Sequence, residues 1–299
     1  MDVTAVIDVG SNSVRLGVFR AGKAEYKTLI TSRLGEGVTC GNLNENAVNR
    51  TINAIAELKD HAFSLGAGEL YAFATEAVRR AENGADFVKK TLVKTGVCIY
   101  IASGEEEASL AVEGALGGKD GAVIDLGGAS TEVAVSRGGK IVYSHSLPVG
   151  AVVLKDICGA DEEKLTAYIA QKTAEYGRVP EADKVYAVGG TATSIAACAA
   201  GLEKYEPEKV HGTNVSVRQI DALAEKLKNL TAGEIAARYP VDGRRAEIIF
   251  GGALLMKGVL SSIGAGGFTA SESDNLEGFY NMLKSGKIKA AKIDLRGGK

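Results

Sequence analysis

The pattern of apolar and polar positions along the chain predicts helices and strands in regular succession. Apolar residues that recur every three or four positions indicate amphipathic helices, and short apolar runs indicate strands. By this criterion we expect helices over 44–63, 82–95, 162–176 and 217–230, and strands over 70–74, 97–102 and 184–188. Thr231 and Glu234 have the spacing of a capping box that begins a further helix. Strands separated by helices indicate an α/β fold, with sheets covered by helices.

An internal repeat adds the most to this picture. Residues 5–23 read AVIDVGSNSVRLGVFRAGK, and residues 122–140 read AVIDLGGASTEVAVSRGGK. Aligned without a gap, at an offset of 117, ten of the nineteen positions are identical. Each copy has an apolar run, an Asp-x-Gly turn, a second β-type run and a glycine turn, which predicts a β-hairpin. We interpret the repeat as a gene duplication that gave two similarly folded halves.

The second hairpin sets the expected division of the chain. It begins after the turn GGKDG, so we expect a first lobe over 1–118 and a second over 119–299. The C-terminal helix of the second lobe can pack back on the first. Residues 284–299 contain six basic residues and one acid, and we expect a solvated, flexible tail there.

Composition and charge restrict the partners. The 299 residues are 45% hydrophobic and 24% charged, as in a soluble α/β protein, and the net charge of −2 attracts neither nucleic acid nor a membrane. No run approaches the ~20 apolar residues that span a bilayer. The four cysteines are far apart and match no metal spacing, so we expect reduced thiols and a cytoplasmic protein. We expect no nucleic-acid or membrane partner, and a homodimer stays open.

Three glycine turns are the candidates for phosphate chemistry. Successive N–H groups in such turns can bind anions, and glycine lets phosphate oxygens come close. Asp8 and Asp125 each end a strand beside such a turn, where a carboxylate can hold Mg²⁺. Taken singly, each could equally be only a tight turn. No GxxxxGK[ST] loop, GxGxxG turn after a strand or GxSxG elbow is present. The candidate residues are Ser11, Asn12 and Ser13; Gly127, Gly128 and Ser130; and Gly189, Gly190 and Thr191.

A glutamate and an arginine could complete such a site. Ser103 and Glu106 fit a capping box, and acids in a first helical turn favour the helix dipole without any further role. Glu107 follows them and could instead face the site as a general base toward water. Arg79 or Arg80 could bind phosphate oxygens through its guanidinium fork, or be surface charge.

Taken in order, the motifs resemble those of the exopolyphosphatase / guanosine pentaphosphate phosphatase (Ppx/GppA) family over nearly the whole chain. They are Asp8-x-Gly-Ser-Asn-Ser, Arg33-Leu-Gly-Glu-Gly, Ala74-Thr-x-Ala-x-Arg-x-Ala-x-Asn83, Ser103-Gly-x-Glu-Glu-Ala108, Asp125-x-Gly-Gly-x-Ser-Thr-Glu132, Leu147-Pro-x-Gly150, Gly189-Gly-Thr and Arg245-Ala-Glu-Ile-Ile249. The resemblance implies the two-lobed, actin-like (ribonuclease H-like) fold with a cleft between the lobes, in the short form that lacks C-terminal helical domains.

The resemblance also implies roles for particular residues. Glu107 falls on the family's catalytic base, and Asp125 and Glu132 fall on its metal-site acids, for Mg²⁺ or Mn²⁺. The phosphate contacts fall on Arg79 and on the glycine turns Ser11–Ser13, Gly127–Ser130 and Gly189–Thr191. One departure concerns the family's late Ser-x-x-Gly-Leu-Arg-Glu-Gly segment. It reads Ser271-Glu-Ser-Asp-Asn-Leu-Glu-Gly278 here, which leaves no arginine for a phosphate contact.

The implied activity is metal-dependent hydrolysis of the terminal phosphoanhydride bond of inorganic polyphosphate, with release of orthophosphate. Guanosine pentaphosphate (pppGpp) is the alternative substrate, and we favour polyphosphate because no feature clearly reads a guanine base. An actin-like kinase that uses ATP is another alternative, since the Gly189-Gly-Thr turn lies where that superfamily contacts adenosine. A non-catalytic nucleotide or polyphosphate sensor is the third. The intact Ser103-Gly-x-Glu-Glu-Ala motif favours the hydrolase.

Overall fold

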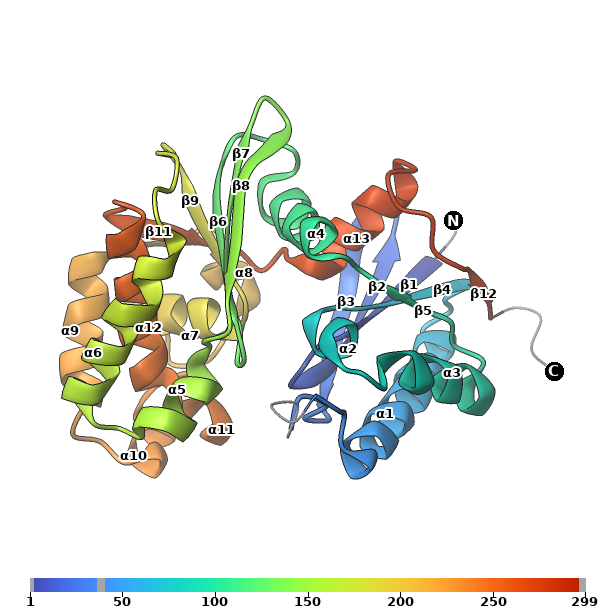
Figure 1. Cartoon of the computed structure of the whole chain (residues 1–299), viewed down its shortest axis with the longest axis horizontal. Helices are drawn as coiled ribbons and strands as arrows, with labels where there is room; N and C mark the ends of the chain where they lie inside the picture. Colours follow the sequence, from blue (N-terminus) through green and yellow to red (C-terminus); the bar gives the residue numbers. More distant parts are fainter. Residues whose placement is uncertain (1–2, 37–40, 296–299) are drawn as a thin grey trace. The chain divides into compact units, whose positions relative to one another are not determined.

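The computed structural model describes residues 3–36 and 41–295 (Figure 1). The chain forms two compact units, each with its own six-stranded mixed sheet. Unit 1 contains the described residues up to Gly114 together with those from Asn275 onward, and unit 2 is Ala115–Asp274. The expected second lobe ran to residue 299, and the structure assigns its C-terminal helix to unit 1, the lobe on which this helix was expected to be able to pack.

The sheet of unit 1 is built around a fully buried strand. All seven residues of β1 (Val3–Val9) are buried, as in a strand covered on both faces. β1 pairs antiparallel with β2 and parallel with β4, and β4 in turn pairs parallel with β5. The strand order is β12-β4-β1-β2-β3, with β5 also beside β4. The remaining strands are β2 (Ser13–Arg20), β3 (Lys23–Thr31), β4 (Glu69–Ala74), β5 (Ile99–Ile101) and β12 (Ile293–Asp294).

Helices of unit 1 form two hydrophobic clusters with this sheet. α1 (Glu45–Ser64) begins at the N-cap Asn44, whose side chain accepts hydrogen bonds from two backbone N–H groups. It buries the face that the periodicity predicts: Val48, Ile52, Ile55, Leu58 and Ala62. In the second cluster, Phe279 stacks on Phe73 at 4.5 Å between ring centroids. The other helices are α2 (Glu76–Arg80), α3 (Gly84–Thr95), α4 (Gly104–Leu116) and α13 (Asn275–Lys284).

Unit 2 repeats the order of five of these strands in its own sheet, and only the place of the sixth strand differs. β6 pairs antiparallel with β7 and parallel with β9, and β9 pairs parallel with β11. The order is β10-β11-β9-β6-β7-β8. The strands are β6 (Gly121–Leu126), β7 (Thr131–Arg137), β8 (Lys140–Leu147), β9 (Val185–Val188), β10 (Asn214–Ser216) and β11 (Gly267–Ala270). The helical elements are α5 (Ala151–Cys158), α6 (Glu162–Thr173), η2 (Ala174–Tyr176), α7 (Gly190–Ala199), α8 (Pro207–Val210), α9 (Val217–Leu227), α10 (Ala232–Arg238), α11 (Gly243–Ala246) and α12 (Ile249–Ser262).

The matching strand orders support the duplication and give the expected two-lobed, actin-like α/β fold. The predicted hairpins are β1–β2 and β6–β7, and each continues into a third antiparallel strand that the sequence pattern did not predict. In both sheets the three parallel strands end at one edge: β1, β4 and β5 in unit 1, and β6, β9 and β11 in unit 2. Ligands of open α/β sheets bind outside this carboxyl edge.

The C-terminal segment differs from the expected solvated tail. Ile288 and Leu295 are buried, and β12 adds a short antiparallel strand to β4. Residues 296–299 of that expected tail, and Cys40 among the expected thiols, lie outside the described residues. Cys98, Cys158 and Cys198 are free thiols, as expected. Among the helices that the structure describes, none is long and apolar enough to cross a membrane.

Candidate functional site

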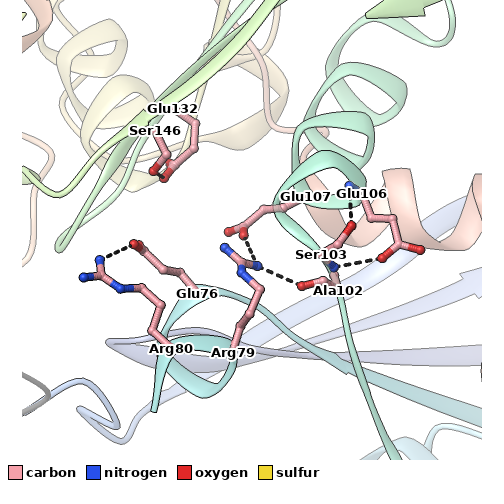
Figure 2. Close-up of polar contacts among 9 residues, drawn as sticks. All are labelled: Glu76, Arg79, Arg80, Ala102, Ser103, Glu106, Glu107, Glu132 and Ser146. Atoms are coloured by element: carbon pink, nitrogen blue, oxygen red, sulfur yellow. Dashed lines mark hydrogen bonds and ion pairs between the residues drawn. The ribbon is translucent and has the colours of Figure 1, made fainter. Parts of the chain in front are cut away.

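Arg79 and Glu107 meet at the carboxyl edge of the sheet in unit 1. Arg79 comes from α2, which follows β4, and Glu107 from the first turn of α4, which follows β5. Arg79 Nη1 donates to Glu107 Oε2 at 2.8 Å and to the carbonyl oxygen of Ala102 at 2.8 Å (Figure 2). Their side chains are 29% and 14% exposed. Arg80, the other candidate arginine, instead pairs with Glu76 on the surface.

The start of α4 is fixed by the predicted capping box. The Ser103 N–H donates to Glu106 Oε2 at 2.8 Å, and the Glu106 N–H donates to Ser103 Oγ at 3.2 Å. The Tyr100 hydroxyl also donates to Glu106. Burial works to raise the pKa of Glu106, but these hydrogen bonds lower it overall. The hydrogen bond to Glu106, helped by burial, raises the pKa of Tyr100 to about 12. Glu106 thus has a structural role, as expected, and Glu107 points elsewhere, toward Arg79 (Figure 2).

The two Asp-x-Gly turns have the same internal geometry. The Gly10 N–H donates to the Ser13 carbonyl, and the Gly127 N–H donates to the Ser130 carbonyl, each at 3.0 Å. The loop after the third strand braces each turn. In unit 1 the Gly35 N–H donates to the Ser11 carbonyl, and in unit 2 N–H groups at the start of α5 donate to the carbonyls of Gly127 and Gly128. Ser11, Asn12 and Ser13, and likewise Gly127, Gly128 and Ser130, are at least partly exposed.

One cross-strand position separates the two turns chemically. In unit 1, Asp8 lies directly opposite Arg15, whose Nε donates to the Asp8 carboxylate at 2.9 Å. In unit 2, Asp125 lies directly opposite Glu132, so two carboxylates share one face of the sheet. Directly opposite residues have Cβ atoms about 4.5–5.5 Å apart. Ser146 on β8 donates to Glu132 at 2.6 Å (Figure 2).

The third turn lies beside Asp125. Gly189 has φ +88°, and a Cβ there would come within 3.0 Å of Asp125 Oδ1, so only glycine fits. α7 begins at Gly190, with Thr191 buried in its first turn. Arg245 of α11 lies against this turn and donates to the Gly190 carbonyl and to Ser194. Asp125, Glu132 and the turns Gly127–Ser130 and Gly189–Thr191 therefore gather at the carboxyl edge in unit 2.

Comparison with known proteins assigns the chain to a family. The model of the Ppx/GppA phosphatase family matches residues 26–284. The chain belongs to this family. Its similarity to the crystal structure of the Aquifex aeolicus Ppx/GppA family member has a TM-score of 0.79, at 27% identity, over 95% of this chain and 98% of the other.

Two curated relatives of this Ppx/GppA family member differ in length. Exopolyphosphatase 2 of Mycobacterium tuberculosis is 27% identical, and the match covers 93% of this chain and 98% of that protein. The bifunctional 3-dehydroquinate synthase/phosphatase of Fusobacterium nucleatum is 28% identical over 92% of this chain. The chain spans only 45% of the length of the Fusobacterium protein.

The predicted site residues of this Ppx/GppA chain fall into two groups, one in each unit. Ser11–Ser13, Arg79 and Glu107 belong to unit 1, and the remaining predicted residues belong to unit 2. Two arginines had been given no role from the sequence: Arg15 contacts Asp8, just before the Ser11–Ser13 turn, and Arg245 contacts Gly190. The repeat alignment could have drawn attention to Arg15, because Arg15 aligns with Glu132 and replaces its acid. For Arg245, the family motif that begins with it was the available signal.

The two acids of unit 2 match the ligands of Mg²⁺ better than those of a metal ion that binds through protein side chains alone. Within residues 3–36 and 41–295, no three His, Cys, Asp or Glu side chains gather closely enough to hold a metal ion. Mg²⁺ usually keeps several waters and takes one or two carboxylates together with substrate phosphates. Asp125 and Glu132 match that donor set. The matching position in unit 1 carries the cation of Arg15 instead of a second acid.

Proposed function

We propose that this Ppx/GppA family member is an exopolyphosphatase that removes the terminal phosphoryl group of inorganic polyphosphate as orthophosphate. The observation that carries the proposal is the pair formed by Arg79 and Glu107 at a carboxyl sheet edge. The Glu107 carboxylate is partly exposed and can accept a proton, and the Arg79 guanidinium that contacts it can bind phosphate oxygens. The exopolyphosphatase among the relatives supports polyphosphate as the substrate.

Glu107 acts as the general base in this mechanism. It accepts a proton from a water molecule whose oxygen bonds to the terminal phosphorus, while the anhydride P–O bond breaks and the shortened chain leaves. Arg79 binds oxygens of that phosphoryl group and keeps Glu107 oriented. Because phosphoryl transfer proceeds through a loose transition state, positioning and charge stabilisation supply most of the rate.

The glycine turns and the paired acids are the further candidates for binding phosphate and metal. Side chains and N–H groups of Ser11–Ser13, Gly127–Ser130 and Gly189–Thr191 contact phosphate oxygens. Asp125 and Glu132 would hold Mg²⁺ or Mn²⁺, and the ion would neutralise phosphate charge. The metal assignment is supported by the contrast with unit 1, where Arg15 neutralises the equivalent acid.

The direct test is a comparison of substrates. Phosphate release would be measured from long-chain polyphosphate, tripolyphosphate, guanosine pentaphosphate and ATP, with Glu107→Gln as the blank. We expect the highest kcat/KM on polyphosphate. A clear preference for guanosine pentaphosphate would move the assignment to the alternative phosphatase, and transfer from ATP to an acceptor without phosphate release would replace it by a kinase.

A further inference from the structure

Arg33 has an unusual backbone conformation for an arginine. Among the described residues, only Arg33 and Ala21 combine a positive φ with a side chain, at φ 52° and 50°. Ala21 has a local reason, because Ala21 and Gly22 form the tight turn between β2 and β3, and such hairpin turns require positive φ. Arg33 follows β3 and lies in no such turn. Non-glycine residues in this region are uncommon and cluster at functional sites.

The conformation of Arg33 is imposed by bonds on both sides of it. The N–H groups of Ser32 and Arg33 both donate to the Asn12 carbonyl, at 3.1 and 2.9 Å. Arg50 of α1 donates through Nε to the Ser32 carbonyl at 3.1 Å and pairs with Glu36 at 2.6 Å. The loop is therefore held against the Ser11–Ser13 turn, with Arg33 directly beside Asn12.

The fold itself does not require an arginine at this position. In unit 2, at the same offset of 117 residues, Gly150 occupies the equivalent place, and the following N–H groups brace the Gly127–Gly128 turn without any side chain there. The Arg33 side chain is exposed, and its guanidinium makes no hydrogen bond or ion pair with any residue that the structure describes. Neither packing nor pairing with described residues thus explains why this position carries an arginine. Its backbone is nevertheless held beside the Ser11–Ser13 turn, which is predicted to bind phosphate.

We propose that Arg33 binds an internal phosphoryl group of polyphosphate, beyond the terminal group at Arg79 and Glu107. This inference rests on the proposed function. The strand order gives its position, since β1, which leads to Ser11–Ser13, lies two strands from β5, which leads to Glu107. Neighbouring strands are about 4.8 Å apart, so the ends of β1 and β5 are about 10 Å apart along the sheet edge. A guanidinium is well suited to two phosphate oxygens at once.

The decisive variant is Arg33→Gly, because it removes the guanidinium and relieves the backbone at the same time. We expect Tm to be unchanged or higher, KM for long-chain polyphosphate to rise about tenfold, as for loss of a charge-assisted hydrogen bond, and kcat to change less than about twofold. The rise in KM should be smaller for tripolyphosphate, which has fewer internal phosphoryl groups. Arg33→Lys should restore part of the affinity.

Two matched controls separate this role from strain and from net charge. Ala21→Gly relieves the other positive φ and should leave KM unchanged. Lys23→Gln removes one exposed positive charge from the same unit and should also leave KM unchanged. An Arg33→Gly protein with wild-type KM would overturn the proposal, and so would an equal loss in Lys23→Gln.

Calorimetric binding of long-chain polyphosphate to the intact protein separates the two claims. If the wild type binds polyphosphate but releases no phosphate, the proposed function fails, while weaker binding by Arg33→Gly still supports the role of Arg33. Equal binding by wild type and Arg33→Gly overturns that role whatever the activity.

Discussion

At the scale of single residues, Arg79 and Arg80 differ in the direction of their side chains and therefore in their partners. Both are basic, adjacent and in the five-residue helix α2. Arg79 contacts Glu107 and the Ala102 carbonyl, whereas Arg80 is 62% exposed and pairs with Glu76. The sequence predicted that one of them could bind phosphate but did not distinguish them from residue type alone, because α2 is too short to show a period.

Replacing each arginine by lysine should separate their roles. A lysine keeps the charge but loses the planar fork that reaches two acceptors at once. We expect Arg79→Lys to lower kcat/KM for polyphosphate by about 10- to 100-fold, and Arg80→Lys to leave it within about twofold. Steady-state phosphate release checks both variants, and equal losses would contradict the assignment of Arg79.

At the scale of elements, α4 links a helix cap to the candidate base. Ser103 and Glu106 form the cap that the sequence predicted, and Glu107 is the next residue. Ser103→Ala removes the side-chain acceptor for the Glu106 N–H and should lower the free energy of unfolding of unit 1 by about 1 kcal/mol. We also expect a lower kcat, because the turn that orients Glu107 frays. Ser109→Ala, later in the same helix, is the control for a lost hydroxyl and should retain the wild-type kcat.

The same cap predicts a dependence on pH. Since folding lowers the pKa of Glu106, its contribution to stability is complete above the unfolded pKa of about 4.3 and is lost as pH falls through the lower folded value. Glu106→Gln should therefore reduce stability at pH 7 more than at pH 3. Urea unfolding at both pH values measures this difference, and equal losses would contradict the role given to the ionised carboxylate.

The paired strands β6 and β7 make the metal testable without an activity assay. If Asp125 and Glu132 hold Mg²⁺, Tm should rise as the Mg²⁺ concentration is raised above its Kd. Asp125→Asn should abolish this rise. Asp120→Asn, an exposed acid just before β6, should retain it. A rise in Tm that persists in Asp125→Asn would locate the metal elsewhere.

The hairpins could be predicted from sequence, but their third strands could not. β1 and β6 are apolar, whereas β3 is an edge strand whose residues are all exposed or half-buried. Such a strand lacks the alternation that signals a half-buried sheet. The pairings of Asp8 with Arg15 and of Asp125 with Glu132 also needed the register of the strands. α12 was missed for the opposite reason, because it is apolar on nearly every face and shows no amphipathic period.

At the scale of the whole molecule, the repeat predicted two similar sheets, but the C-terminal segment had to be located by the structure. Charge alone suggested a solvated tail from residue 284. Its few apolar residues decide otherwise, since Ile288 joins the cluster around Phe73 and Phe279, and Leu295 joins the cluster beneath α1. Pairing with distant strands leaves no periodic signal in so short a segment.

Substitution of neighbouring residues tests the location of this segment. Ile288→Ala should lower the free energy of unfolding of unit 1 by about 2–4 kcal/mol, because Ile288 is only 3% exposed. Lys289→Ala, at the exposed next position, should change it by less than about 0.5 kcal/mol. Denaturant unfolding measures both variants. An unchanged free energy of unfolding in Ile288→Ala would contradict the packing of this segment and favour the solvated tail expected from the sequence.

The assignment of Glu107 as the base is the central claim, and one pair of measurements on Glu107→Gln tests it most directly. The amide keeps the shape and can still accept from Arg79, but it cannot take a proton from water. We predict that phosphate release from polyphosphate falls by about 10²–10⁴-fold while calorimetric binding of polyphosphate stays within about threefold. Glu105→Gln, exposed in the same turn, should behave as wild type. Wild-type turnover by Glu107→Gln would contradict the account.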